Sequence, residues 1–313
     1  MLSCAHNKFN PETDIPPLTG ETVIVTGGNN GLGLQSVLHF ARAGAKVYMC
    51  SRSTAKAYAA ISSTKSTDPS ADIHVLELEL GSLESVKTAA QAFLSANDRL
   101  NILMLNAGIM AVPEGITKDG YEIQFGTNHL GHAALAKCLL PLMVQRAAQP
   151  GSDVRVVTLT SHGQALFAPN EGMLLDQVKG TLSSLGPWGR YGHSKLANIY
   201  FAKGLAKHYP QILSVAVHPG GVKGTGLGDT ARATSQSWLT QVALAITKKL
   251  MMSVEEGVRG QLWASVADRT EVGAGKVYYP VGKEHKGREL VNDERQVDAL
   301  WDWTENALSA SGL

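Results

Sequence analysis

Short apolar runs alternate along the chain with longer segments in which hydrophobic positions recur at helical spacing. Seven apolar, β-branched runs are expected to form strands: 22–26, 46–50, 73–78, 102–106, 154–160, 212–218 and 276–280. Five segments between them are expected to form helices: 31–43, 55–65, 83–96, 120–145 and 191–208. Near-continuous apolar strands suit a parallel sheet that is covered on both faces. The pattern therefore predicts an α/β fold, a doubly wound, mostly parallel seven-stranded sheet with helices on both faces.

The chain divides at residue 17 into an irregular lead-in and one continuous domain. Three prolines, Pro11, Pro16 and Pro17, disfavour regular structure in residues 1–17. Residues 18–313 contain no internal repeat, low-complexity tract or linker, so we expect a single domain. Two long loops, near 162–190 and 219–250, follow the carboxyl ends of predicted strands. Open α/β sheets bind ligands at that edge, so we expect both loops to contact substrate.

Composition and charge exclude several classes of protein. Apolar residues make up 44% and charged residues 18% of the 313 residues, unlike a collagen, a coiled coil or a disordered chain. The charge balance of 28 − 27 = +1 provides no global field that would recruit nucleic acid or an anionic membrane. The most apolar stretches, 102–112 and 238–246, are too short to span a bilayer, and the first twenty residues show no secretory signal.

The cysteines and histidines give no indication of a metal or of a disulfide framework. The three cysteines are scattered, at Cys4, Cys50 and Cys138, which favours a reducing compartment. We therefore expect a cytoplasmic protein without a bound metal. Four histidines lie near the motifs described below but lack zinc-site spacing, and we interpret them as solvated or hydrogen-bonded: His129, His132, His162 and His193.

A glycine-rich turn lies directly between the first predicted strand and the first predicted helix. Within residues 26–33, Gly27, Gly31 and Gly33 would let backbone N–H groups approach a pyrophosphate at the helix N-terminus. An ordinary tight turn is the alternative, since Ser36 replaces the last glycine of Gly-x-Gly-x-x-Gly. Its place in a repeated β–α pattern favours a Rossmann-type dinucleotide site that comprises Gly27, Asn29, Asn30, Gly31, Leu32 and Gly33.

The end of the second predicted strand favours NADP(H) over NAD(H). An NAD site normally places an acid about 20 residues after the glycine loop, but no Asp or Glu occurs between Glu21 and Asp68. The strand instead ends with Ser51 and Arg52, and a guanidinium can grip a 2′-phosphate and stack on adenine. A solvated basic helix face is the alternative interpretation, and it suffices for Lys56.

Tyr191 and Lys195 are spaced i,i+4 on a predicted helix and therefore share one face. A free tyrosine has a pKa of about 10, and a nearby ammonium would lower that pKa enough for acid–base work. By itself, Tyr-x-x-x-Lys usually marks a surface pair. Ser161 follows a strand whose carboxyl end can face the same cleft, and Asn128 lies in the helical segment before that strand.

These motifs, in this order along residues 18–227, resemble the short-chain dehydrogenase/reductase family: the glycine loop, Asn106-Ala107-Gly108, Asn128, Ser161, Tyr191-x-x-x-Lys195 and Pro219-Gly220. Within the family, the segments 191–199 and 51–52 are similar to the retinol-dehydrogenase-like and WW-domain-oxidoreductase-like branch. The lead-in from Phe9 to Gly20 is similar to fungal members of that branch.

The resemblance implies a role for each matching residue. Tyr191 would be the general acid for reduction, Lys195 would lower its pKa and hold the nicotinamide ribose, and Ser161 would bind the substrate carbonyl. Asn128 would hold a water in a proton relay. Further cofactor contacts would come from Ser51, Arg52, Glu79, Leu80, Asn106, Ala107, Gly108, Pro219, Gly220, Val222 and Thr225. Phe167 and Trp188, in the long loop, are either substrate walls or simple packing residues.

Three positions depart from the family pattern. Leu105 replaces the first Asn of Asn-Asn-Ala-Gly, and Glu79 stands where an Asp commonly meets the adenine. The interval from Ser161 to Tyr191 is 191 − 161 = 30 residues, which resembles the retinol-dehydrogenase-like branch. That insertion would form one wall of the substrate pocket.

The sequence thus predicts an NADP(H)-dependent oxidoreductase that interconverts a ketone or aldehyde and an alcohol on a lipophilic small molecule, with secondary metabolism as one setting. One alternative is a catalytically idle NADP(H)-binding sensor or scaffold of the same fold. A second is a sugar-nucleotide epimerase or dehydratase, which the modest length of residues 228–313 disfavours. The resemblance also implies a possible homodimer, formed through paired long helices.

Overall fold

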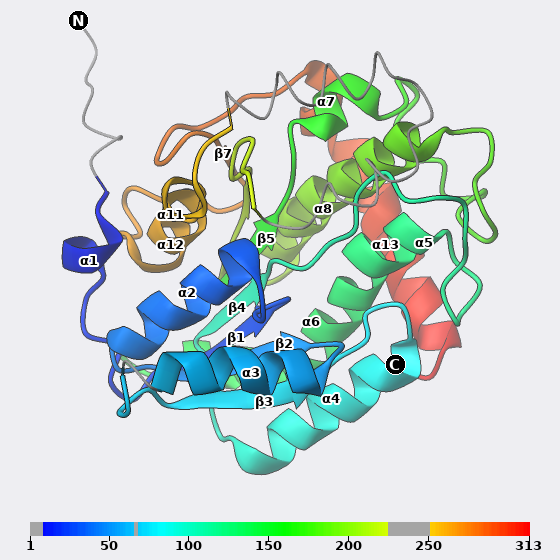
Figure 1. Cartoon of the computed structure of the whole chain (residues 1–313). Helices are drawn as coiled ribbons and strands as arrows, with labels where there is room; N and C mark the ends of the chain where they lie inside the picture. Colours follow the sequence, from blue (N-terminus) through cyan, green and yellow to red (C-terminus); the bar gives the residue numbers. More distant parts are fainter. Residues whose placement is uncertain (1–8, 66–67, 225–250) are drawn as a thin grey trace, which may run out of the picture.

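The computed structural model describes residues 9–65, 68–224 and 251–313, and within these ranges seven parallel strands form one sheet (Figure 1). The strands are β1 (Thr22–Thr26), β2 (Lys46–Ser51), β3 (Ile73–Glu77), β4 (Ile102–Leu105), β5 (Arg155–Leu159), β6 (Leu213–Val217) and β7 (Val277–Tyr278). Their order is β3-β2-β1-β4-β5-β6-β7, so the direction of winding reverses between β1 and β4. Open α/β sheets bind ligands at such a point, outside the carboxyl ends of the strands. The predicted doubly wound fold is confirmed.

Helices cover both faces of the sheet and enclose two hydrophobic cores. One core packs the sheet against α2 (Gly31–Arg42), α3 (Thr54–Lys65) and α12 (Arg259–Val266). The other packs it against α4 (Leu83–Ala96), α6 (Gly131–Ala147), α8 (Pro187–His208) and α13 (Glu294–Ala310). Within the described part of the chain, no helix is both long enough and apolar enough to cross a membrane.

The strands lie where the apolar runs predict them, whereas three helical boundaries differ. The segment 120–145 forms α5 (Ile123–Phe125), a π-helix η2 (Gly126–Leu130) and α6, and the Asn128 side chain projects from the π-helix to bond Ile109. Helix α8 starts at Pro187, since proline is favoured in a first helical turn. The lead-in contains a short helix α1 (Pro11–Asp14), which the Asn10 side chain caps.

The C-terminal third contains helices that the sequence reading did not assign. These are α11 (Val254–Gly257), α12, the 3₁₀ turn η3 (Glu289–Asn292) and α13, while α7 (Gly163–Phe167) lies in the long loop. Helix α13 buries a stripe formed by Val297, Leu300, Trp301, Thr304 and Leu308. Trp301 lies close to Gly204 of α8 and stacks on His208 at 4.4 Å between ring centroids. The i,i+3,i+4 spacing of this stripe predicts a helix.

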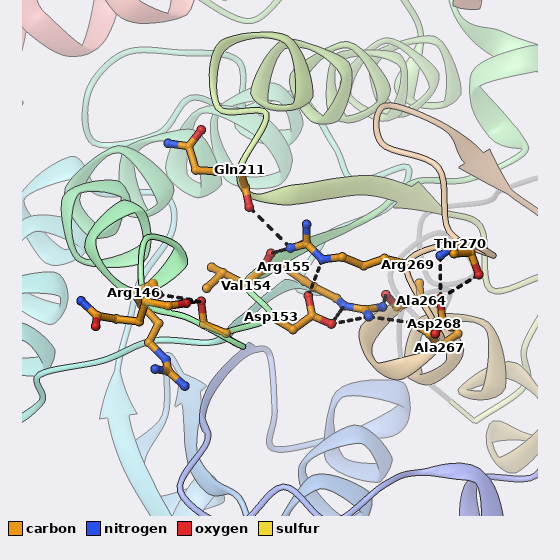
Figure 2. A network of polar contacts seen from close by, with 12 residues as sticks. Arg146, Asp153, Val154, Arg155, Gln211, Ala264, Ala267, Asp268, Arg269 and Thr270 are labelled. Carbon is orange, nitrogen blue, oxygen red and sulfur yellow. Dashed lines mark hydrogen bonds and ion pairs between the residues drawn. The ribbon is translucent and has the colours of Figure 1, made fainter.

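A polar network around the buried Arg155 lies at the amino ends of β5 and β6, opposite the carboxyl edge (Figure 2). Arg155 is only 2% exposed and donates to the Ala264 and Ala267 carbonyl oxygens at the end of α12, at 3.0 and 2.6 Å. Asp153 accepts from Arg155 at 2.9 Å and from Arg269 at 2.9 Å. The network caps α12 and fixes it to the sheet.

Candidate active site

Ser161, Tyr191 and Lys195 meet at the carboxyl end of β5. The buried Tyr191 hydroxyl shares a hydrogen bond with the Ser161 side chain. Lys195 Nζ lies 5.9 Å from the centre of the Tyr191 ring and donates to the Leu159 carbonyl oxygen at 3.1 Å. A Cβ at Gly163 would lie 3.0 Å from the Tyr191 ring, so a larger residue there would crowd the ring. The structure therefore brings together the three side chains that the sequence singled out for proton chemistry.

Burial shifts the pKa values of both Tyr191 and Lys195. It raises the pKa of Tyr191 to about 12, although the hydrogen bond with Ser161 acts to lower it. Burial also lowers the pKa of Lys195 to about 8. The expected lowering of the Tyr191 pKa by Lys195 stays a prediction. At neutral pH the phenol is protonated.

Asn128 lies in the π-helix η2, and its side chain links two segments of the site. Its amide nitrogen donates to the Ile109 carbonyl oxygen and to Ser194 Oγ, both at 2.9 Å. Its amide oxygen accepts from the Ile109 N–H at 2.8 Å. Ser194 Oγ in turn donates to the Tyr191 carbonyl oxygen at 2.8 Å. Both N–H groups of the Asn128 amide are thus committed to the protein, and its water-holding role stays a prediction.

Thr26 and His132 complete this hydrogen-bond chain, and the sequence reading did not select them. Thr26 Oγ1 accepts from the backbone N–H groups of Asn106 and Ala107 at 2.9 and 3.0 Å. Because His132 Nδ1 bonds to the Asn128 carbonyl oxygen at 2.9 Å, its Nε2 accepts the Thr26 hydroxyl proton at 2.8 Å. Burial lowers the pKa of His132 to about 4, which favours this neutral form. The available signal was the i,i+4 spacing of Asn128 and His132.

The glycine loop has a geometry that only glycine permits. Gly27 and Gly31 have φ of +66° and +52°, and a Cβ at Gly33 would overlap the Gly27 carbonyl oxygen. The Asn30 side chain caps α2 by accepting from the Gly31 N–H at 2.8 Å, and the first turn of α2 contains no acid. The loop therefore presents a helix N-terminus without a competing carboxylate, as phosphate binding requires. Asn106 supports it through a 2.8 Å bond from its side chain to the Thr26 carbonyl oxygen.

Arg52 and Glu79 lie together beyond the ends of β2 and β3. Arg52 is 79% exposed, and its Nε lies 3.5 Å from a Glu79 carboxylate oxygen. The other Glu79 oxygen accepts from the Gly81 N–H at 3.1 Å. Leu80 is buried, and its carbonyl oxygen packs against Gly131. The Arg52 guanidinium is thus largely exposed at this edge, beside the Glu79 carboxylate.

The remaining predicted cofactor positions lie around the same edge. A Cβ at Gly108 would lie 3.3 Å from Lys195 Nζ, so glycine keeps the space in front of the ammonium open. Gly220 has a φ of +87°, and Val222 pairs with Met252 in a parallel bridge. Pro219 precedes this turn. Thr225 lies outside the described residues, as does most of the predicted loop 219–250.

An aromatic wall extends from Tyr191 toward solvent. The Trp188 ring lies 6.4 Å from the Tyr191 ring, edge to face, and 5.3 Å from the Phe167 ring. Leu166 and Phe167 of α7 are both exposed large hydrophobic residues. The structure thus places Trp188 beside the Tyr191 ring and Phe167 on the Trp188 ring, and their role as substrate walls stays a prediction.

The histidines near the motifs fall into two groups. His129 and His193 are buried, and both rings contact the Phe125 ring. The His129 ring hydrogen-bonds to the Thr304 hydroxyl, and the His193 ring accepts from the Leu174 N–H, each at 3.0 Å. His162 is exposed and lies about 6 Å, between ring centroids, from two further histidines, His218 and His285. Among the described residues, no group of three His, Cys, Asp or Glu side chains is arranged to hold a metal ion.

Comparison with known proteins identifies the family. A short chain dehydrogenase profile matches residues 21–168. The short-chain dehydrogenase/reductase drtF of Aspergillus calidoustus is 34% identical over 307 residues, covering 94% of this chain and 95% of that protein. Mouse retinol dehydrogenase 12 is 31% identical over 291 residues, covering 91% and 85%. The crystal structure of an uncharacterized Mycobacterium paratuberculosis protein is 29% identical with a TM-score of 0.72, covering 96% and 97%.

The matches to drtF and to retinol dehydrogenase 12 each extend over more than nine-tenths of the chain, well beyond the profile match. They include the segments that carry the Asn128, Ser161, Tyr191 and Lys195 cluster. The chain belongs to the short-chain dehydrogenase/reductase family of oxidoreductases, in its retinol-dehydrogenase-like branch.

Proposed function

We propose that this protein is an NADP(H)-dependent reductase of a ketone or aldehyde on a lipophilic small molecule. The observation that carries the proposal is the Tyr191 phenol, hydrogen-bonded to Ser161 and lying beside Lys195 at the ligand-binding edge of the sheet. An acid, a hydrogen-bonding hydroxyl and a cation within one small volume are the groups that carbonyl reduction requires.

The proposed chemistry assigns a proton step to the chain. Ser161 orients the substrate carbonyl oxygen, and Tyr191 donates its proton to that oxygen as negative charge develops there. A phenol with a pKa raised to about 12 is fully protonated at neutral pH, as a donor must be. Lys195 then stabilises the phenolate that remains, and its pKa of about 8 keeps most of it charged at pH 7. The bound nicotinamide cofactor would supply the hydride.

The residues at the carboxyl ends of β1 and β2 fit a phosphorylated dinucleotide. Gly27, Gly31 and Gly33 leave backbone space at the N-terminus of α2 for a pyrophosphate. Beyond β2 stand Ser51 and the exposed Arg52 in place of the carboxylate that a ribose 2′-hydroxyl would need. These features support NADP(H) as the cofactor, with Arg52 on the 2′-phosphate.

The substrate side supports a lipophilic carbonyl compound. Trp188 lies beside the Tyr191 ring and Phe167 packs on Trp188, so the two rings offer an apolar wall. The net charge of +1 gives no preference for a strongly anionic substrate. A role in secondary metabolism, in the cytoplasm, is the setting that we propose for such a reaction.

The proposal is tested with purified protein, NADPH or NADH, and a panel of lipophilic ketones and aldehydes. We expect NADPH oxidation that depends on the carbonyl compound, and a weaker rate with NADH. Tight NADPH binding without turnover of any carbonyl or alcohol in the panel would contradict the proposal and favour an idle cofactor-binding sensor. Cofactor that stays bound through dialysis would favour an epimerase or dehydratase.

A further inference from the structure

Arg190 directly precedes Tyr191 in α8, and its side chain is almost completely buried, with 1% exposed. Its guanidinium donates to the Leu185 carbonyl oxygen at 2.7 Å and to the Val112 carbonyl oxygen at 3.3 Å. Its Nε lies 3.3 Å from Glu122. These partners belong to three separate segments: the loop after β4, the residue that caps α5, and the end of the insertion between Ser161 and Tyr191. One side chain therefore joins three segments to the first turn of α8.

Arg190 has two charged partners. Glu114, which is 52% exposed, lies 3.6 Å from its guanidinium, and Glu122 is fully buried. One carboxylate oxygen caps α5 by accepting from the Phe125 N–H at 2.6 Å. The other has no hydrogen bond, and it lies against the Arg190 guanidinium as its ion-pair partner. An isolated buried charge is strongly unfavourable, so the carboxylate and the guanidinium each depend on the other.

Gln124 joins the same three segments a second time. Its side-chain oxygen accepts from the Ala111 N–H at 2.8 Å, and its nitrogen donates to the Pro187 carbonyl oxygen at 2.9 Å. Ala111 has a φ of +48°, a conformation that a non-glycine residue adopts only when its surroundings impose it. The insertion also pairs with this region through a 2.9 Å bond from the Glu122 N–H to the Val178 carbonyl oxygen.

We propose that Arg190 is a positioning residue of the active site: through Glu122, Val112 and Leu185 it sets the place of the first turn of α8. This proposal rests on the proposed role of Tyr191 as proton donor. Trp188 and Tyr191 lie in that turn, 6.4 Å apart, so a shift of the turn moves the phenol and the substrate wall together. Displacement of reacting groups by about 1 Å can reduce rates by about 10²-fold.

The chemistry requires arginine at this position. A lysine ammonium can neutralise Glu122, but it is a point charge on a flexible stem. The planar guanidinium instead directs separate N–H groups at Leu185, at Val112 and toward Glu122. Arg190→Lys should therefore retain more stability than Arg190→Met while still losing the fixed geometry.

The test compares Arg190→Met, Arg190→Lys and the double variant Glu122→Gln/Arg190→Met with the wild type. The matched control is Arg155→Met, which removes the buried arginine at the opposite end of the sheet. The readouts are kcat and KM for a carbonyl compound that the wild type reduces, NADPH affinity, Tm, and amide hydrogen exchange of segments 109–115 and 173–186.

We expect kcat/KM for the carbonyl compound to fall by about 10- to 100-fold in Arg190→Met, with NADPH affinity within twofold. The double variant should recover Tm relative to Arg190→Met, because it removes the unpaired charge, while its kcat/KM stays low. Exchange in 109–115 and 173–186 should rise at least tenfold in Arg190→Met. Arg155→Met should lower Tm without changing kcat/KM or exchange in these segments.

Two results would overturn the role of Arg190. One is a kcat/KM within twofold of the wild type in Arg190→Met; the other is a loss in Arg155→Met of the same size. If the wild type reduces no carbonyl compound, the amide hydrogen exchange data test the positioning role of Arg190 on their own. Faster exchange in Arg190→Met but not in Arg155→Met would then support the positioning role while the proposed function fails. Unchanged exchange would overturn the role.

Discussion

Two buried arginines stand at opposite ends of the same sheet and are stabilised in different ways. Arg155, at the amino end, bonds two backbone carbonyls and Asp153, whose side chain is 45% exposed (Figure 2). Arg190, at the carboxyl end, pairs with Glu122, which has no exposure at all, and at 3.6 Å with Glu114, which is 52% exposed. Asp153 therefore keeps part of its hydration, whereas Glu122 has given up all of it.

The difference follows what each end does. At the amino end Asp153 accepts hydrogen bonds from both Arg155 and Arg269, and the network fixes α12 to the sheet. At the carboxyl end, Glu122 Oε1 and Arg190 Nε are buried without a hydrogen bond, and Ala111 adopts a strained φ nearby. Unpaired buried polar atoms also occur at the amino end, at Arg146 Nε and Ser214 Oγ, so the strained φ of Ala111 carries the contrast, because backbone strain gathers at functional sites. We infer that the carboxyl end places the active-site side chains at some cost in stability, whereas the amino end mainly stabilises the fold.

The largest expected effect separates activity from stability at the carboxyl end. Tyr191→Phe removes the proton donor and should reduce kcat by about 10³-fold, because a positioned general acid contributes about 10²- to 10⁴-fold. Its Tm should change little, since the hydroxyl bonds only the Ser161 side chain. Steady-state kinetics and thermal unfolding measure both quantities.

Tyr200→Phe is the matched control, because this tyrosine lies on the same helix and its hydroxyl bonds the Leu290 carbonyl oxygen at 2.6 Å. It should lose about 1 kcal/mol of unfolding free energy and keep its activity. A Tyr191→Phe enzyme with more than one-tenth of the wild-type kcat would remove Tyr191 from the proton step.

The second effect lies at the amino end. Arg155→Met leaves the Ala264 and Ala267 carbonyls and the buried part of Asp153 without their donor, which should lower the unfolding free energy by about 3 kcal/mol. For a chain of this length, Tm would fall by about 6 °C. Urea unfolding gives the free energy. Equal losses of stability and of kcat/KM would show that the two ends are not independent.

The sheet and the catalytic side chains were predictable because both depend on local patterns. Continuous apolar runs such as residues 22–26 mark buried parallel strands, and Tyr191 and Lys195 share a helix face by spacing alone. Glu122 and Arg190 were not predictable. They are 68 residues apart, and nothing in a local pattern distinguishes a buried charge from an exposed one until the insertion folds over it.

The burial of the Tyr191 phenol was not predictable for a similar reason. The sequence shows that an ammonium is near, but the degree of burial of the phenol depends on α7, Gly163 and the insertion.

The third effect tests a residue that the sequence did single out, Arg52, at the same carboxyl edge. Arg52→Ala should weaken NADPH use by about 10- to 100-fold in kcat/KM, because a hydrogen bond to a charged group contributes about 1.5–3 kcal/mol. Use of NADH should be nearly unchanged. Lys56→Ala, an exposed basic residue of α3, is the control and should stay within twofold with both cofactors. An equal loss with NADPH and NADH would mean that Arg52 does not read the 2′-phosphate.

The smallest expected effect is on how the free energy of unfolding changes with each pH unit, which should differ between substitutions at the two ends of the sheet. Burial lowers the pKa of His129 to about 3, below its usual 6.5, with His132 and His193 acting in the same direction. Below pH 6.5 the unfolded chain therefore binds a proton that the native chain rejects, and stability falls with pH down to about 3. The loss is about 1.4 kcal/mol per pH unit for this histidine. His129→Phe, which fits among Phe125 and Phe201, should reduce the slope of stability against pH by that amount.

Asp153 supplies the contrast within the same measurement. Burial alone would raise the pKa of Asp153, but hydrogen bonds and charge from Arg155 and Arg269 outweigh it and lower the pKa below 3.8. A carboxylate with a depressed pKa loses its contribution to stability only as pH falls below its unfolded value. Asp153→Asn should consequently lower stability equally at pH 7, 6 and 5. Urea unfolding at these three pH values would therefore give a smaller slope for His129→Phe and an unchanged slope for Asp153→Asn. The opposite assignment would mean that the amino end, and not the buried histidines beside the site, limits stability in mild acid.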